Sequence, residues 1–136
     1  LLICLATIVN GVPNPFIKVN TMDEAFKMTG FTLETPATYK NYKKKVINVI
    51  KNKMIEVVYL KESNTEGLFI RKSKGTYKTN KDIKTVKIGD YDVREKTKEE
   101  NISLATWTDG TYSYVINPNG TKLNAEDMAE LILSIK

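Results

Sequence analysis

The chain contains no histidine and only one cysteine, Cys4, among its 136 residues. Histidine is the commonest general base and metal ligand near neutral pH, so its absence removes the largest class of acid–base and metal sites. A single cysteine excludes an intrachain disulfide framework. Nucleophilic catalysis also lacks its usual partners, because no serine is followed three residues later by lysine. We therefore expect no catalytic residue of these kinds.

Glycine is also scarce, with seven residues, and no two of them form a G-x-G motif. The glycine-rich loops that hold the phosphates of nucleotides are therefore absent. Asp90 and Asp92 have the spacing that begins a calcium loop, but the glycine and the twelfth-position glutamate of such a loop are missing. No metal and no cofactor is expected.

The composition is that of a folded domain, with 41% hydrophobic and 27% charged residues. A chain of this length fits one domain and buries roughly two-thirds of its unfolded surface. We expect residues 12–136 to form that domain, as a monomer.

The first nine residues carry no charge, and the chain does not begin with methionine. This run is too short to span a bilayer but suits the apolar part of a secretory signal, with a cleavage site after Gly11. Residues 1–11 are thus predicted to be a signal-peptide remnant, which implies export. The alternative is an N-terminal strand in which Cys4 is a small buried side chain.

Basic residues are concentrated in the middle of the chain. Residues 40–87 hold fourteen basic and four acidic residues, whereas residues 88–136 hold five basic and nine acidic ones. The run that contains Lys43, Lys44 and Lys45 is a candidate surface for a polyanion, such as an envelope polymer or a lipid headgroup. Nucleic acid is not the expected partner of an exported chain. The alternative is that nineteen lysines reflect AT-rich codons and a solvated surface.

Two helices are predicted, one near each end of the domain. Thr21 with Glu24 forms a capping box, and Gly30 ends the helix that follows. Asn124 caps a second helix, whose apolar residues Met128, Leu131, Ile132 and Ile135 share one face.

Between the helices, β-branched and aromatic residues recur in short runs that are typical of strands. Gly89-Asp90 and Asp109-Gly110 are two-residue hairpin turns. The fold class is therefore α+β, a curved antiparallel meander of about seven or eight strands packed against both helices. The predicted strands are 31–35, 46–50, 54–60, 68–72, 85–88, 91–96, 102–108 and 111–116, and the stretch from Lys74 to Lys84 is a long loop.

Three aromatic residues, Trp107, Tyr112 and Tyr114, flank the Asp109-Gly110 turn. Aromatic residues on neighbouring strands form cross-strand pairs in a core, which is the simpler interpretation. The alternative is that they floor a shallow groove, and they are the candidate ligand surface of this sequence.

Three stretches of the chain carry a resemblance to one protein family. The first is Asn14-Pro15-Phe16, with the helix that begins near Met22 and with Gly30-Phe31. The second is residues 54–59, Met-Ile-Glu-Val-Val-Tyr, and the third is residues 104–114, from Leu104 through Trp107 and the Asp109-Gly110 turn to Tyr114. In this order, they are similar to the opening, the central strand and the most recognisable motif of the domain of unknown function 4367 family of Firmicutes. That family is found in secreted proteins, lipoproteins and anti-sigma-factor-like proteins.

The resemblance implies an extracytoplasmic sheet with no catalytic residues to carry over, although a lipobox cysteine is not evident here. Together with the residues, it leads us to expect a non-enzymatic, envelope-associated domain at a Gram-positive cell surface. Its partner is expected to be an envelope polymer, a lipid headgroup or a membrane protein. The alternative is a small hydrolase or transferase that uses carboxylates alone.

Overall fold

The computed structural model describes residues 14–76 and 83–136. The predicted signal remnant at residues 1–11, with Cys4, lies outside these ranges, as do residues 77–82 of the loop predicted between Lys74 and Lys84. The elements are β1 (Ile17–Val19), α2 (Met22–Thr29), β2 (Lys44–Ile50), β3 (Met54–Leu60), β4 (Glu66–Lys74), β5 (Lys84–Ile88), β6 (Tyr91–Lys98), β7 (Asn101–Thr108), β8 (Tyr112–Asn117) and α3 (Ala125–Leu133).

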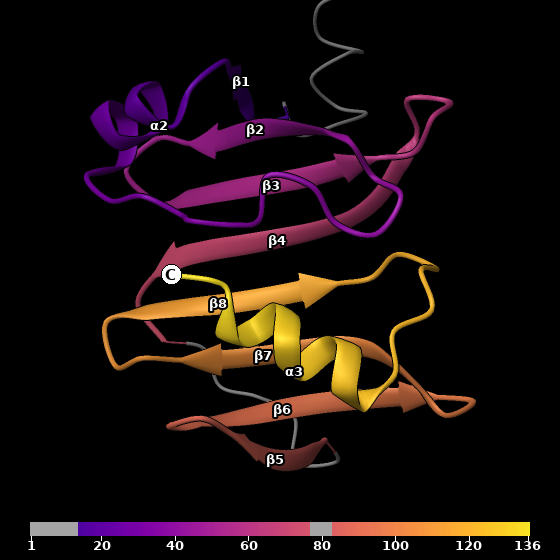
Figure 1. The fold of residues 1–136 in the computed structure, drawn as a ribbon. Helices are drawn as coiled ribbons and strands as arrows, with labels where there is room; N and C mark the ends of the chain where they lie inside the picture. Colours follow the sequence, from indigo (N-terminus) through magenta and orange to yellow (C-terminus); the bar gives the residue numbers. More distant parts are fainter. Residues whose placement is uncertain (1–13, 77–82) are drawn as a thin grey trace, which may run out of the picture.

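All eight strands form one antiparallel sheet in the order β1-β2-β3-β4-β8-β7-β6-β5 (Figure 1). The predicted α+β class is confirmed. In detail the sheet consists of two four-stranded meanders, because β4 pairs with β8 rather than with β5. The chain therefore passes from the centre of the sheet to its far edge between β4 and β5.

α2 begins and ends where the local sequence predicts, whereas α3 begins where predicted but ends at Leu133, before the Ile135 that the sequence included in it. The Thr21 hydroxyl accepts a hydrogen bond from the Glu24 amide, and Gly30 ends α2 in the left-handed region at φ 85°. Asn124 and Asp127 form a complete capping box at the start of α3. Neither of these helices is long and apolar enough to cross a membrane.

The segment from Phe31 to Thr35, predicted as a strand, is not part of the sheet. Phe31 and Leu33 are buried nonetheless. The backbone of Glu34 exchanges two hydrogen bonds with Lys136, the last residue of the chain. The run of β-branched and aromatic residues thus identified a segment with buried side chains, but the segment pairs with Lys136 and not with a strand of the sheet. The short edge strand β1 was not predicted.

The two faces of the sheet differ in what they carry. α3 and the segment after α2 lie over one face (Figure 1), which holds an apolar cross-strand row that includes Val57, Ile70 and Ile116. We call the opposite side the helix-free face. Its central row runs through all eight strands and is polar except at Val115. In order it holds Lys18, Asn48, Glu56, Arg71, Val115, Thr106, Arg94 and Thr85.

Candidate functional site

The predicted aromatic surface lies largely inside the protein. Trp107 and Tyr114 are register partners on β7 and β8, and their rings stack with centroids 5.1 Å apart and planes 4° from parallel. Both residues are buried, whereas Tyr112 is partly exposed and contacts Phe31 at 4.8 Å between ring centroids. Little of the Trp107 and Tyr114 surface is therefore left for a ligand, which agrees with the interpretation of these aromatic residues as cross-strand pairs in the core.

A buried lysine completes this aromatic cluster. The Lys72 ammonium lies 4.5 Å from the Tyr112 ring centroid and 5.5 Å from that of Tyr114, and it donates a hydrogen bond of 2.8 Å to the Thr32 carbonyl. A cation over aromatic faces is attracted by the ring quadrupoles. Burial lowers the pKa of Lys72, an effect that the nearby Asp109 carboxylate opposes. The Lys72 ammonium therefore already occupies the position over the Tyr112 and Tyr114 rings that a cationic ligand would take.

Asp109 links the turn to the aromatic stack. One carboxylate oxygen accepts hydrogen bonds from the amides of Thr111 and Tyr112, and the other accepts one of 3.0 Å from the Tyr114 hydroxyl. Desolvation raises the pKa of Asp109, but these hydrogen bonds and Lys72 outweigh it and lower the pKa below its ordinary value. Burial and the hydrogen bond to Asp109 raise the pKa of Tyr114. Asp109 is therefore held ionised as a structural acceptor.

The three lysines of the predicted polyanion surface do not point the same way. Lys45 is the register partner of the core residue Tyr59, and its ammonium donates hydrogen bonds to the Thr35 hydroxyl at 3.1 Å and to the Pro36 carbonyl at 3.3 Å. Burial lowers the pKa of Lys45. All three lysines are exposed, but Lys43 and Lys44 line a different part of the surface. Lys44 and Lys45 are consecutive in β2 and point to opposite faces of the sheet, and Lys43 precedes the strand.

Lys43 and Lys44 instead meet Lys61, which the sequence did not single out. Two adjoining hollows of about 570 Å³ and 240 Å³ share Asn41, Lys43, Lys61 and Glu62 as lining residues, and Lys44 lines the smaller one. We call Lys43, Lys44 and Lys61 the basic end of the sheet. None of the three forms an ion pair with any described residue.

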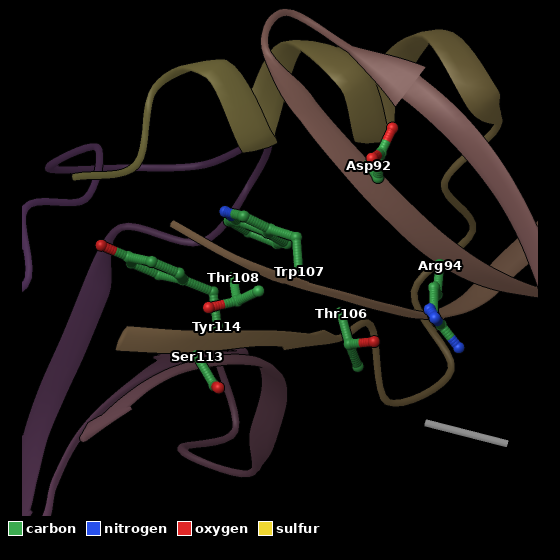
Figure 2. Close-up of a pocket in the computed structure, with 7 residues that line it drawn as sticks. All are labelled: Asp92, Arg94, Thr106, Trp107, Thr108, Ser113 and Tyr114. Atoms are coloured by element: carbon green, nitrogen blue, oxygen red, sulfur yellow. The ribbon is translucent and has the colours of Figure 1, made fainter. Parts of the chain in front are cut away.

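Another hollow, of about 270 Å³, lies beside Arg94 between β6, β7 and β8 (Figure 2). Trp107 and Tyr114 of the predicted ligand surface are among its lining residues, whereas the sequence did not single out Arg94. Figure 2 shows the Trp107 and Tyr114 rings on one side of the strands and the Ser113 and Arg94 side chains on the other. The lining residues are Asp92, Arg94, Thr106, Trp107, Thr108, Ser113 and Tyr114.

Carboxylates are poorly placed for chemistry in the part of the chain that the structure describes. Glu56 and Glu66 line one hollow, but the Glu56 oxygens already accept from Arg71 at 2.7 Å and from Asn48 at 3.0 Å. Asp90 lies in the exposed β5–β6 turn, and Asp92 is exposed near the start of β6. Across residues 14–76 and 83–136, no group of three or more acidic or cysteine side chains is arranged to hold a metal ion.

Comparison of the chain with protein-family models, with curated proteins and with solved structures found no match. The geometry of the described residues must therefore carry any functional argument.

Proposed function

We propose that this chain is a non-enzymatic, extracytoplasmic binding domain whose basic end contacts an anionic envelope polymer. The observation that carries the proposal is the grouping of Lys43, Lys44 and Lys61 around two adjoining hollows with no ion-pair partner among the described residues. Exposed unpaired cations around a concave surface attract a polyanion and release its counterions.

The distribution of charge over the fold supports this assignment. Residues 14–76, which include β1 to β4, hold twelve basic and six acidic residues, whereas residues 83–136 hold seven basic and nine acidic ones. The domain therefore has a basic half and a weakly acidic half. Such a polarity orients a domain on an anionic surface.

Binding to a poly(glycerol phosphate) polymer tests the proposal. The triple variant Lys43→Gln, Lys44→Gln and Lys61→Gln removes the three charges of the basic end. We expect wild-type binding at low salt, a steep fall at physiological salt because screening acts within about 8–10 Å, and loss of binding in the variant.

A matched control removes three exposed lysines at the other end of the same strands, Lys51, Lys53 and Lys74. This control variant has the same net charge and should retain most of the binding. Equal loss in both triple variants would show attraction by net charge alone and overturn the proposal. Vesicles that contain phosphatidylglycerol form a separate arm, and binding to vesicles without binding to polymer would assign the basic end to lipid headgroups instead.

Export is the second part of the proposal and rests on the uncharged run at residues 1–9 and on the family resemblance, which spans about residues 14–136. A chain expressed with its native upstream sequence in a Gram-positive host should appear outside the membrane with its N-terminus near Val12. Intact-mass analysis of the extracellular material tests this. Secreted protein that retains Leu1 would contradict cleavage at that site.

A further inference from the structure

The helix-free face places both arginines of the chain in one cross-strand row. Arg71 on β4 pairs with Val115, Val115 pairs with Thr106, and Thr106 pairs with Arg94 on β6. Three strand spacings separate the two arginines, a distance of about 14 Å. The two side chains thus lie on the same face of the sheet but have different surroundings.

Arg71 is fully engaged within the protein. Its Nε donates a hydrogen bond of 2.7 Å to the buried Glu56 carboxylate, and its guanidinium lies over the rings of Phe69 at 4.7 Å and Phe16 at 5.5 Å. An ion pair and two aromatic contacts are a sufficient structural reason for an arginine on a half-buried sheet face.

Arg94 has none of these contacts. Among the described residues, its guanidinium has no salt bridge, hydrogen bond or aromatic ring as a partner. Its register neighbour Thr106 has a buried hydroxyl that likewise finds no hydrogen-bond partner there. Both groups line the hollow of Figure 2. An uncommitted guanidinium fork beside an uncommitted hydroxyl presents several hydrogen-bond donors to one small space.

Two other hydroxyls that line the hollow, those of Ser113 and Thr108, can act as hydrogen-bond acceptors. Ser113 donates its proton to the Gly75 carbonyl at 2.6 Å, and Thr108 donates its proton to the Tyr112 carbonyl at 2.7 Å. The Thr108 oxygen also accepts a hydrogen bond of 3.1 Å from the Gly110 amide, which leaves it one lone pair. Both hydroxyl oxygens can therefore still accept a hydrogen bond from a ligand hydroxyl. The hollow therefore combines donors for an oxyanion with acceptors for hydroxyl groups.

We propose that the hollow beside Arg94 binds a small hydroxylated carboxylate, such as a sugar acid. The carboxylate lies against Arg94 and Thr106, and the hydroxyls of the ligand donate to Ser113 and Thr108. A volume of about 270 Å³ is just below the range of about 300–1,000 Å³ for drug-sized ligands, so the ligand is small. Asp92, at the edge of the hollow and already paired with Lys87, disfavours a doubly charged phosphate. This site is separate from the basic end and does not depend on the proposed function.

Titration calorimetry with D-glucuronate, with glucose and inorganic phosphate as comparison ligands, tests the proposal on the full chain. We expect glucuronate to bind and the other two to bind at least about tenfold more weakly, because a charge-assisted hydrogen bond is stronger than a neutral one and Asp92 repels a dianion. No glucuronate binding at millimolar concentration, or tighter binding of phosphate, would overturn the proposal.

Three variants locate the site. Arg94→Gln should weaken glucuronate binding at least about tenfold. Lys96→Gln removes one positive charge from an exposed side chain two residues along the same strand and should change the affinity little. Thr106→Val removes the buried hydroxyl at nearly constant volume, so it should weaken binding without lowering the melting temperature. Equal effects of Arg94→Gln and Lys96→Gln would reduce the site to non-specific attraction and overturn the proposal, whichever result the polymer experiment gives.

Discussion

Trp107 on β7 stacks face to face on Tyr114 on β8, with ring planes 4° from parallel. The two residues belong to strands joined by the Asp109-Gly110 turn, and both are buried. The pair therefore connects a local hairpin to the core that the helices cover.

Trp107→Ala should lower the free energy of unfolding by about 3–5 kcal/mol, the usual cost of removing a buried indole. Trp107→Phe retains a ring that can stack on Tyr114 and should cost clearly less. Urea unfolding followed by far-ultraviolet circular dichroism measures both changes. An unchanged midpoint for Trp107→Ala would show that the stack contributes nothing to the core.

The C-terminal helix offers a comparison between two leucines. Leu131 is 2% exposed and Leu133 is 57% exposed on the same helix. Leu131→Ala should cost about 2–5 kcal/mol of unfolding free energy, whereas Leu133→Ala should stay within about 0.5 kcal/mol of wild type. Denaturant midpoints compare the two. Similar effects would contradict closure of the core by α3.

Glu95 is 4% exposed and is an acid in the apolar cross-strand row, next to Ala105. One of its carboxylate oxygens has no hydrogen-bond partner among the described residues, and burial raises its pKa although Lys84 on the edge strand opposes the change. The folded state then binds a proton more readily than the unfolded state. The raised pKa of Glu95 therefore favours the folded state below the ordinary glutamate pKa, and this contribution to the free energy of unfolding is lost as the pH rises through the raised value.

Glu95→Gln should therefore raise the unfolding free energy at pH 7 and change it much less at pH 4. Glu100→Gln, at the exposed β6–β7 turn, is the control and should show no such difference. Urea midpoints at the two pH values give the measurement. A variant that is less stable than wild type at pH 7 would show that the Glu95 charge is stabilised in the fold.

Asp109 should show the opposite dependence on pH. Its pKa is lowered on balance, so its contribution to stability is present above the ordinary aspartate pKa and is lost as the pH falls through the lowered value. Asp109→Asn should cost about 1 kcal/mol at pH 7, since the turn is exposed, and very little near pH 2. Thermal unfolding at both pH values, with Tyr114→Phe as the variant that removes only the hydroxyl donor, tests the assignment.

The sequence alone determined the features that depend on a few neighbouring residues. Thr21, Gly30 and Asn124 fix the helix ends because their hydrogen bonds and backbone angles act within one turn. Runs of β-branched and aromatic residues likewise located β2 to β8, because these side chains favour the extended backbone of a strand. The α+β class follows from these local elements.

Only the tertiary structure decided which distant segments meet. The pairing of β4 with β8 brings Arg71 and Arg94 into one row, and the β2–β3 pairing brings Lys44 beside the strand end that precedes Lys61. The local sequence also gave no reason to exclude Phe31–Thr35 from the sheet. It did not show that the backbone of Glu34 forms hydrogen bonds with that of Lys136. These contacts are set by the total burial and register of an eight-stranded sheet, to which every strand contributes, and not by hydrogen bonds between near neighbours.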